Sequence, residues 1–253
     1  MNVSVLQLDL VWHDRAANHA KAAEMLRADP PAPGNLVVLP EAFPVGFTMR
    51  VDEVADHANE TGRFICDLAR THQVTVVGGN MIKPDDRGRN IAIVAGPSGH
   101  VIAQYTKIHP FSFAGEPEHY RGGETLTHFN CAGATVSPLI CYDLRFPEAF
   151  RLAARGGAQV FVVIANWPTP RVSHWLALLT ARAIENQAYV IGCNRCGADP
   201  HVPYPGRSVV IDPQGKTIAD AGDAECVLKA TLDLQMLRDY RKSFPALQDM
   251  RLI

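Results

Sequence analysis

Residues 134–165 read ATVSPLICYDLRFPEAFRLAARGGAQVFVVIA, and their pattern predicts a strand, a helix and a second strand in that order. Both ends of the stretch are rich in β-branched and other apolar residues, which is typical of strands. Pro147 suits the first turn of a helix and Gly156–Gly157 ends it, so we expect a helix over 147–155. The closing run, VFVVIA, is apolar at every residue, as in strands with both faces covered. The stretch therefore predicts an α/β fold.

The same two patterns recur on either side of this stretch. Further strands are expected over residues 3–8, 36–39, 74–77, 91–95, 101–105, 189–193, 208–211 and 227–232. Further helices are expected around Ala16, Ala20, Ala23 and Leu26, around Val54, Ala58, Phe64 and Leu68, and over 173–187 with Ser173 as the N-cap. Turn signals at Pro97–Gly99 and Asp212–Gly215 imply antiparallel pairs, so we expect mixed sheets.

The composition limits the class of protein. The chain has 253 residues, 47% of them hydrophobic and 20% charged, so we expect one domain over residues 1–253. A formal net charge of -2 without a basic run argues against nucleic acid as a partner. Residues 1–14 contain no basic leader, and no stretch approaches the roughly 20 apolar residues that span a bilayer, so we expect no membrane partner and a cytoplasmic protein. The six scattered cysteines are expected to be reduced and mostly buried.

Three predicted strands end on a chemically capable residue. LVVLP leads into Glu41, VIAQYT into Lys107 and TVSPLI into Cys141. In layered α/β proteins the ligand pocket lies beyond the carboxyl ends of strands, where side chains from several strands can converge. Each residue alone also fits an ordinary structural role, as a solvated acid, a surface lysine or a core cysteine. Their shared placement indicates that the three side chains meet at one site.

The three side chains would together make a nucleophilic site. A thiol attacks an acyl carbon only as the thiolate, so it needs a base nearby. The tetrahedral intermediate needs positive charge or N–H donors at its oxyanion. Glu41 and Lys107 supply these two functions around Cys141, and the buried set should titrate as one coupled unit. His109 offers another base, but an imidazole just past a strand is more often a hydrogen-bonded structural group.

These residues lie in three sequence blocks that resemble, in order and wording, the motif blocks of the nitrilase superfamily. The blocks are LPEAF at 39–43, YTKIHPF at 105–111 and LICYDLRFPE at 139–148. The resemblance is closest to the bacterial ω-amidase branch, and it extends to GFTM at 46–49, NWPTPR at 166–171, RAIENQ at 182–187 and GRSVVIDPQG at 206–215. It implies a four-layer α-β-β-α sandwich, commonly assembled as a homodimer or higher homo-oligomer, without metal or organic cofactor.

The resemblance also implies roles for individual residues. Glu41 resembles the general base, Lys107 the oxyanion stabiliser and Cys141 the nucleophile that carries a thioester, with the backbone N–H of Tyr142 completing the oxyanion hole. Many members of the superfamily have a second glutamate after the lysine. Glu116 and Glu118 are both candidates here, and the spacing of Glu116 to the residues downstream fits the branch better.

The resemblance implies hydrolysis of a small amide. In the ω-amidase branch the substrate is a 2-oxo acid with a terminal amide, so the pocket must also hold a carboxylate, for which arginine is best suited. Arg171 is the better candidate, because Arg145 is expected to form a structural ion pair with Asp143 or Glu148. Three aromatic residues are candidates for the pocket wall, namely Phe47, Tyr142 and Trp167.

Other functions remain open at this point. A nitrilase, or an amidase for another small acid such as the deaminated-glutathione type, would carry the same motifs near the nucleophile. A non-catalytic binding domain of the same fold is a further alternative. The intact set of Glu41, Lys107 and Cys141 argues against it, because a buried charge cluster is costly to keep without a function.

Overall fold

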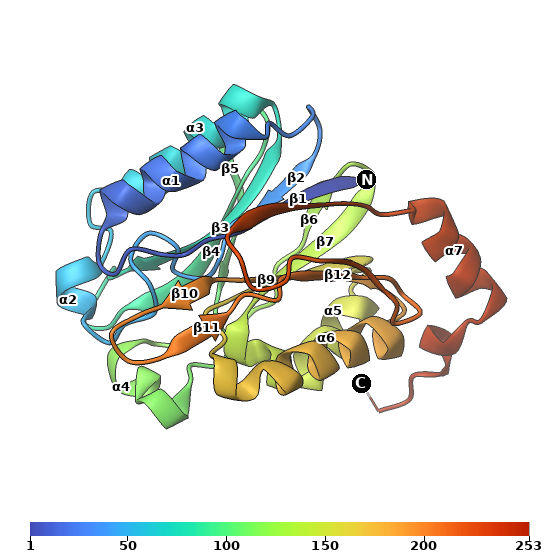
Figure 1. Cartoon of the computed structure of the whole chain (residues 1–253). Coiled ribbons are helices and arrows are strands. Elements are labelled where there is room, and N and C mark those ends of the chain that lie inside the picture. Colours follow the sequence, from blue (N-terminus) through green and yellow to red (C-terminus); the bar gives the residue numbers. More distant parts are fainter. Residues whose placement is uncertain (253) are drawn as a thin grey trace.

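Two six-stranded mixed sheets lie face to face at the centre of the structure, a computed structural model that describes residues 1–252 (Figure 1). The first sheet has the order β14 (Cys226–Thr231), β1 (Asn2–Gln7), β2 (Leu36–Val38), β3 (Thr75–Ile82), β4 (Arg89–Ala95) and β5 (Val101–Thr106). The second has the order β13 (Thr217–Asp220), β12 (Val209–Ile211), β9 (Tyr189–Asn194), β8 (Val160–Ala165), β7 (Ala134–Ile140) and β6 (Phe129–Cys131). A separate hairpin joins β10 (Cys196–Ala198) to β11 (Pro203–Pro205). Parallel pairs form the middle of the second sheet and antiparallel pairs its edges. The two predicted turns join antiparallel pairs, β4 with β5 and β12 with β13.

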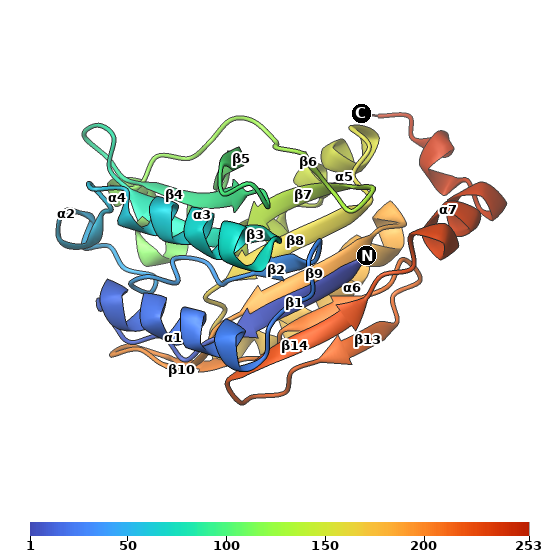
Figure 2. The same cartoon turned by 90° about the horizontal axis from the view of Figure 1, so that it is seen from above.

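Helices cover the outer face of each sheet. The first sheet carries α1 (Arg15–Ala28) and α3 (Glu60–His72), and the second carries α5 (Pro147–Arg155) and α6 (Val172–Asn186). Figure 2 shows α1 and α3 side by side over the strands, with α7 (Leu234–Ser243) beyond the end of the sheets. Two short helices, α2 (Val51–Val54) and α4 (Glu116–His119), lie in loops. The arrangement confirms the predicted α-β-β-α layers, and none of these helices is both long and apolar enough to span a membrane.

The layers explain why the central strands are apolar at nearly every residue. In β1, Val5 packs in the core between the two sheets, whereas its neighbour Leu6 packs against the helical layer. Successive strand residues point to opposite faces, so a strand covered on both sides needs apolar residues at both. In the outer strands β5 and β14 Tyr105 is the one buried residue, and the others are exposed or partly exposed.

Two local expectations were wrong, and one helix was missed. The pattern from Val54 to Leu68 does not form one helix: α2 ends at Val54, Ala58 lies in a turn, and α3 begins at Glu60 after Asn59 at φ 54°. The Asp56 carboxylate accepts hydrogen bonds from the first N–H groups of α3 and so fixes the break. Ser173 is not an N-cap, because α6 begins one residue earlier, directly after a 3-10 turn. The helix α7 was not predicted.

Candidate active site

The three strand-end residues meet at one end of the two sheets. Glu41 lies shortly after β2, Lys107 directly follows β5 and Cys141 directly follows β7. The Lys107 ammonium lies 3.1 Å from Glu41 Oε1, and the charges of Glu41 and Lys107 both act on the Cys141 thiol. Lys107 and Cys141 also line the same cavity. The convergence that the sequence predicted is therefore present.

A buried ion cluster surrounds Lys107. Its Nζ donates to Glu41 Oε1 and to Glu116 Oε2, the latter at 2.9 Å, and all three side chains are nearly or fully buried. Glu116 also accepts from the backbone N–H of Phe111 and, at 3.2 Å, from Asn90 Nδ2. Burial alone would lower the pKa of Lys107, but the Glu116 and Glu41 carboxylates outweigh it and raise the pKa well above its usual value. The side chain is therefore a cation at neutral pH.

Of the two candidate glutamates, Glu116 and not Glu118 contacts Lys107. Glu116 is fully buried and contacts the lysine, whereas Glu118 is exposed to solvent. Both residues belong to the short helix α4, which begins after Gly115 at φ 75°. That left-handed conformation is readily adopted by glycine, and it turns the chain so that Glu116 points inward.

Two asparagines orient the Glu41 carboxylate. Asn90 Nδ2 donates to Oε1 at 2.8 Å, and the backbone N–H of Asn166 donates to Oε2 at 2.8 Å. Asn166 Nδ2 also donates to the Glu41 carbonyl oxygen at 2.6 Å. The Glu41 backbone lies close to β3, since a Cβ at Gly79 would come within 2.6 Å of Glu41 Cα. Sequence reasoning missed both asparagines, although Asn166 directly follows β8 and carries the same strand-end signal as the three residues it found.

Cys141 opens a 3-10 turn over Cys141–Arg145 and has a φ of 46°. This left-handed conformation is uncommon for a residue with a side chain. Cys141 is partly exposed as a residue and lines the cavity. Burial raises its pKa well above the usual range, Glu41 raises it further, and Lys107 partly opposes both. The resting thiol is therefore protonated at neutral pH, and it needs a base in order to attack. The next residue, Tyr142, lies in the first turn, where N–H groups lack acceptors within the helix.

Asp143 and His109 form a structural pair beside the site. The Asp143 carboxylate is fully buried and lies 2.8 Å from His109 Nδ1, and the His109 ring stacks on Phe146 with ring centroids 3.7 Å apart. This agrees with the expected structural role of His109. The expected ion pair of Arg145 with Asp143 or Glu148 is wrong: within residues 1–252 Arg145 pairs with neither acid. Its guanidinium instead lies 4.9 Å above the Trp167 ring.

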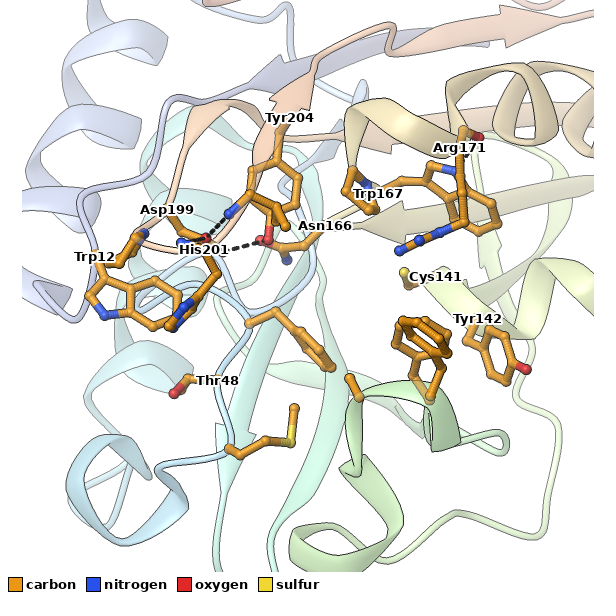
Figure 3. Close-up of a pocket in the computed structure, with 18 of the residues that line it drawn as sticks. Trp12, Thr48, Cys141, Tyr142, Asn166, Trp167, Arg171, Asp199, His201 and Tyr204 are labelled. Carbon is orange, nitrogen blue, oxygen red and sulfur yellow. Dashed lines mark hydrogen bonds between the residues drawn. The ribbon is translucent and has the colours of Figure 1, made fainter.

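A cavity of about 640 Å³ opens above Cys141 (Figure 3). All four predicted substrate-binding residues line it, namely Phe47, Tyr142, Trp167 and Arg171. The basic side chains in its lining are Arg50, Lys107, Arg145 and Arg171, whereas Asp199 is the one acid among the lining residues. The cavity therefore favours an anionic ligand. Within residues 1–252 no group of three His, Cys, Asp or Glu side chains is arranged to hold a metal ion.

The wall nearest Cys141 is aromatic and basic. Trp167 Nε1 donates to the Arg171 carbonyl oxygen at 2.7 Å, which fixes the indole against the 3-10 turn Thr169–Arg171. The Arg171 guanidinium lies 5.6 Å from the ring centroid of Phe111. Such a contact leaves the edge of the guanidinium free to bind a carboxylate with two parallel hydrogen bonds.

The opposite wall was not predicted. Figure 3 shows Trp12, Asp199 and His201 on the far side of the cavity from Arg171 and Tyr142. Asp199 accepts a hydrogen bond from the Tyr204 hydroxyl at 2.6 Å, which holds the β10–β11 hairpin together. These residues come from a loop after β1 and from a hairpin near residue 200, and no local pattern connects those segments. The cavity is larger than a five-carbon acid amide requires, because pockets of roughly 300–1,000 Å³ hold drug-sized ligands.

Comparison with known proteins identifies the family. The family model for carbon-nitrogen hydrolases matches residues 2–242. The chain is 34% identical over 252 residues to the 2-oxoglutaramate amidase of Bacillus subtilis (strain 168), covering 98% of this chain and 97% of that protein. It is 37% identical over 251 residues to omega-amidase YafV of Escherichia coli (strain K12), covering 98% and 96%. The crystal structure of XC1258 from Xanthomonas campestris, a CN-hydrolase superfamily protein, matches with a TM-score of 0.93 at 31% identity, covering 100% of this chain and 98% of that one. These matches confirm the resemblance drawn from the three sequence blocks, and the chain belongs to the carbon-nitrogen hydrolase family.

Proposed function

We propose that the protein is an ω-amidase that hydrolyses the terminal amide of a small 2-oxo acid, such as 2-oxoglutaramate or 2-oxosuccinamate, and releases ammonia. The observation that carries the proposal is the contact of Lys107 with Glu41 and Glu116 directly beneath a cysteine that faces a basic cavity. The two amidases of the comparison, which share most of their length with this chain, support the same substrate class.

The proposed reaction begins with a proton transfer. Glu41 takes the thiol proton of Cys141, and the sulfur forms a bond to the amide carbon. The carbonyl π electrons move onto oxygen, and this oxyanion is stabilised by the Lys107 ammonium and the Tyr142 N–H. When the oxyanion collapses, the C–N bond breaks and the nitrogen takes the proton from Glu41. Ammonia leaves, and a thioester on Cys141 remains.

A water molecule completes the cycle. Glu41 accepts a proton from the water as its oxygen attacks the thioester carbon, through a second oxyanion beside Lys107. The C–S bond then breaks, the proton returns to the sulfur, and the acid product leaves with the Cys141 thiol restored. Glu116 accepts a hydrogen bond from Lys107 Nζ at 2.9 Å and keeps the lysine in place. We propose that Arg171 binds the substrate carboxylate against the wall of Phe47, Tyr142 and Trp167.

Ammonia release from 2-oxoglutaramate tests the proposal. The wild-type enzyme should turn over, whereas Cys141→Ala should lose at least about 10⁴-fold in kcat, since removal of a covalent nucleophile has effects of this size. Cys66→Ala is a matched control, because Cys66 lies on α3 in the outer helical layer and should leave kcat unchanged. Mass spectrometry of the quenched enzyme should show the acyl adduct on Cys141. Full turnover by Cys141→Ala would remove the covalent mechanism.

The far wall of the cavity favours a second candidate, an amidase of the deaminated-glutathione type that accepts a larger group on the amide nitrogen. The space bordered by Trp12, Asp199 and His201 could hold such a group while the acyl part faces Arg171. A panel of primary amides, N-substituted amides and nitriles of the same acid separates the possibilities. Turnover of the primary amide alone supports the ω-amidase, whereas turnover of nitriles alone would contradict both amidase proposals.

We further propose that the chain folds as one domain and acts as a cytoplasmic homodimer or higher homo-oligomer. Two exposed apolar residues on the edge strand β5, Val101 and Ile102, support self-association, because pairing or packing at this edge would cover them. Light scattering on a size-exclusion column would measure the mass, and a monomeric mass at micromolar concentration would contradict the assembly.

A further inference from the structure

We propose that Asp143 is a positioning residue for the reaction, because one buried carboxylate joins the segment that carries Lys107 to the turn that carries Cys141. The inference rests on the proposed function, in which the sulfur and the ammonium must act on the same carbonyl group. Asp143 is fully buried and is not part of the cavity lining. It therefore acts on the reaction only through its neighbours.

Three of the hydrogen bonds to Asp143 come from the lysine segment. The Tyr105 hydroxyl donates to Oδ2 at 2.7 Å, and the His109 backbone N–H donates to Oδ1 at 3.0 Å. The His109 ring nitrogen Nδ1 lies 2.8 Å from the same oxygen. Tyr105 and His109 are placed on either side of Lys107 in the chain, so these bonds fix the backbone from which the lysine extends.

The fourth hydrogen bond comes from the residue before the nucleophile. The Ile140 backbone N–H donates to Asp143 Oδ2 at 3.0 Å. The bond links the residue before Cys141 to the second residue after it and so closes the turn at the nucleophile. The φ of Cys141, 46°, is strained for a residue with a side chain. Such a conformation persists only where the surrounding structure enforces it. The Asp143 carboxylate is therefore placed to hold the nucleophile in this conformation.

The four bonds require a carboxylate. Its two oxygens accept about four hydrogen bonds, and here both oxygens receive two each. An asparagine has one acceptor oxygen and an NH₂ group, so Asp143→Asn would set the NH₂ against a backbone N–H, that of His109 or that of Ile140, whichever oxygen it replaces. The turn and the lysine segment would then move apart slightly, and a displacement of about 1 Å can cost about 100-fold in rate.

Asp56 provides a matched control for the loss of a buried carboxylate. It accepts from the backbone N–H groups of Glu60 at 2.8 Å and Thr61 at 2.9 Å, and from Asn80 Nδ2 at 3.0 Å. It caps α3 and does not line the cavity. Asp56→Asn should therefore lower the thermal unfolding midpoint about as much as Asp143→Asn but leave the position of the sulfur unchanged.

The experiment compares the wild-type full chain with Asp143→Asn, Tyr105→Phe and Asp56→Asn. Three quantities are measured: kcat and KM for 2-oxoglutaramate, the rate at which iodoacetamide alkylates Cys141, and the unfolding midpoint. Asp143→Asn should lower kcat about 100-fold, with KM within about threefold. Alkylation should slow about fivefold, because the thiolate loses part of its contact with the Lys107 charge.

Tyr105→Phe removes one of the four hydrogen bonds to Asp143 and should lower kcat about tenfold. Asp56→Asn should stay within about twofold of wild type in kcat.

Several outcomes would overturn the proposal. The first is an Asp143→Asn variant whose kcat and alkylation rate equal those of the wild type. The second is an Asp143→Asn variant that has the same unfolding midpoint as Asp56→Asn and loses no more kcat than that control. If Asp143→Asn does not fold, Tyr105→Phe decides, and wild-type kcat in that variant contradicts the proposal. If the wild-type enzyme hydrolyses no amide, the proposed function fails, and the alkylation rates still test the positioning role of Asp143.

Discussion

The bottom of the active-site cavity and its walls are built in opposite ways. The bottom is a buried cluster in which Lys107 and Asn166 line the cavity, while Glu41, Asn90 and Glu116 lie outside the lining and are hydrogen-bonded to those two residues and to one another. The walls consist of side chains from loops and 3-10 turns, and they include partly exposed arginines and Phe113, which is 84% exposed.

The difference separates the chemistry from the choice of substrate. Buried charges are tolerated only when every partner is in place, so the bottom has little freedom to change. Loop residues on a rigid scaffold can change with little effect on the fold, and substrate selection commonly depends on them. Substitutions at the bottom should therefore alter kcat and stability, whereas substitutions in the walls should alter KM.

Among the changes that compare the bottom with the walls, the largest effect is expected for Lys107→Met at the bottom of the cavity. Glu41 and Glu116 would face each other without a cation, and the oxyanion would lose its charge partner, so kcat should fall at least about 10³-fold. Breaking a buried pair should also lower the free energy of unfolding by about 3–5 kcal/mol. Ammonia release and urea unfolding measure the two quantities.

Lys83→Met is the control for this change, because Lys83 pairs with the exposed Asp52. Loss of this surface pair should lower the free energy of unfolding by at most about 1 kcal/mol. If the two variants had equal free energies of unfolding, the buried cluster would contribute no more to stability than a surface pair. That result would contradict the proposed difference between the bottom and the walls.

A smaller effect of a different kind is expected for Arg171→Ala in the wall. Loss of a carboxylate partner should raise KM for 2-oxoglutaramate about 10- to 100-fold and leave kcat within about threefold. Arg155→Ala, on the exposed end of α5, should leave both unchanged. Steady-state kinetics distinguish the two variants, and a fall in kcat at constant KM would place Arg171 with the chemistry instead.

The smallest effect, about tenfold for each pH unit, concerns the resting thiol. Burial and the Glu41 carboxylate raise the pKa of Cys141 above its usual range, so the thiolate fraction increases as the pH rises towards that pKa. Alkylation by iodoacetamide should therefore quicken about tenfold per pH unit between about pH 7 and pH 9, without a plateau. Peptide mass spectrometry follows Cys141 separately from the other thiols. A rate that is constant above pH 7 would instead indicate a preformed thiolate paired with Lys107.

The strand pattern of the sequence was sufficient to find the three residues of the proposed reaction. Glu41, Lys107 and Cys141 each come at or just past the carboxyl end of a strand, and the carboxyl ends of strands that run in the same direction lie at one edge of a sheet. Asn166 carries the same signal and could have been found in the same way. Asn90 could not, because it lies within β4, where a polar residue has no distinctive pattern.

The far wall, the break between α2 and α3 and the helix α7 could not be predicted from the sequence, for a different reason. Trp12 and His201 come from segments almost two hundred residues apart, and only packing brings them to one cavity. The break between α2 and α3 depends on the Asp56 carboxylate, and α7 buries little more than Leu237 against the body of the molecule. Local periodicity does not record such contacts.

The sequence by itself determined the α/β class, the layered order of strands and helices, and the three residues of the proposed reaction, because these depend on the hydrophobic period and on the residue type at the end of each strand. Tertiary structure alone decided which acid contacts Lys107, what Asp143 and Arg145 contact, and how large the cavity is. The physical reason is range: periodicity depends on neighbours along the chain, whereas the partners of a buried charge are set by segments that fold against it from elsewhere.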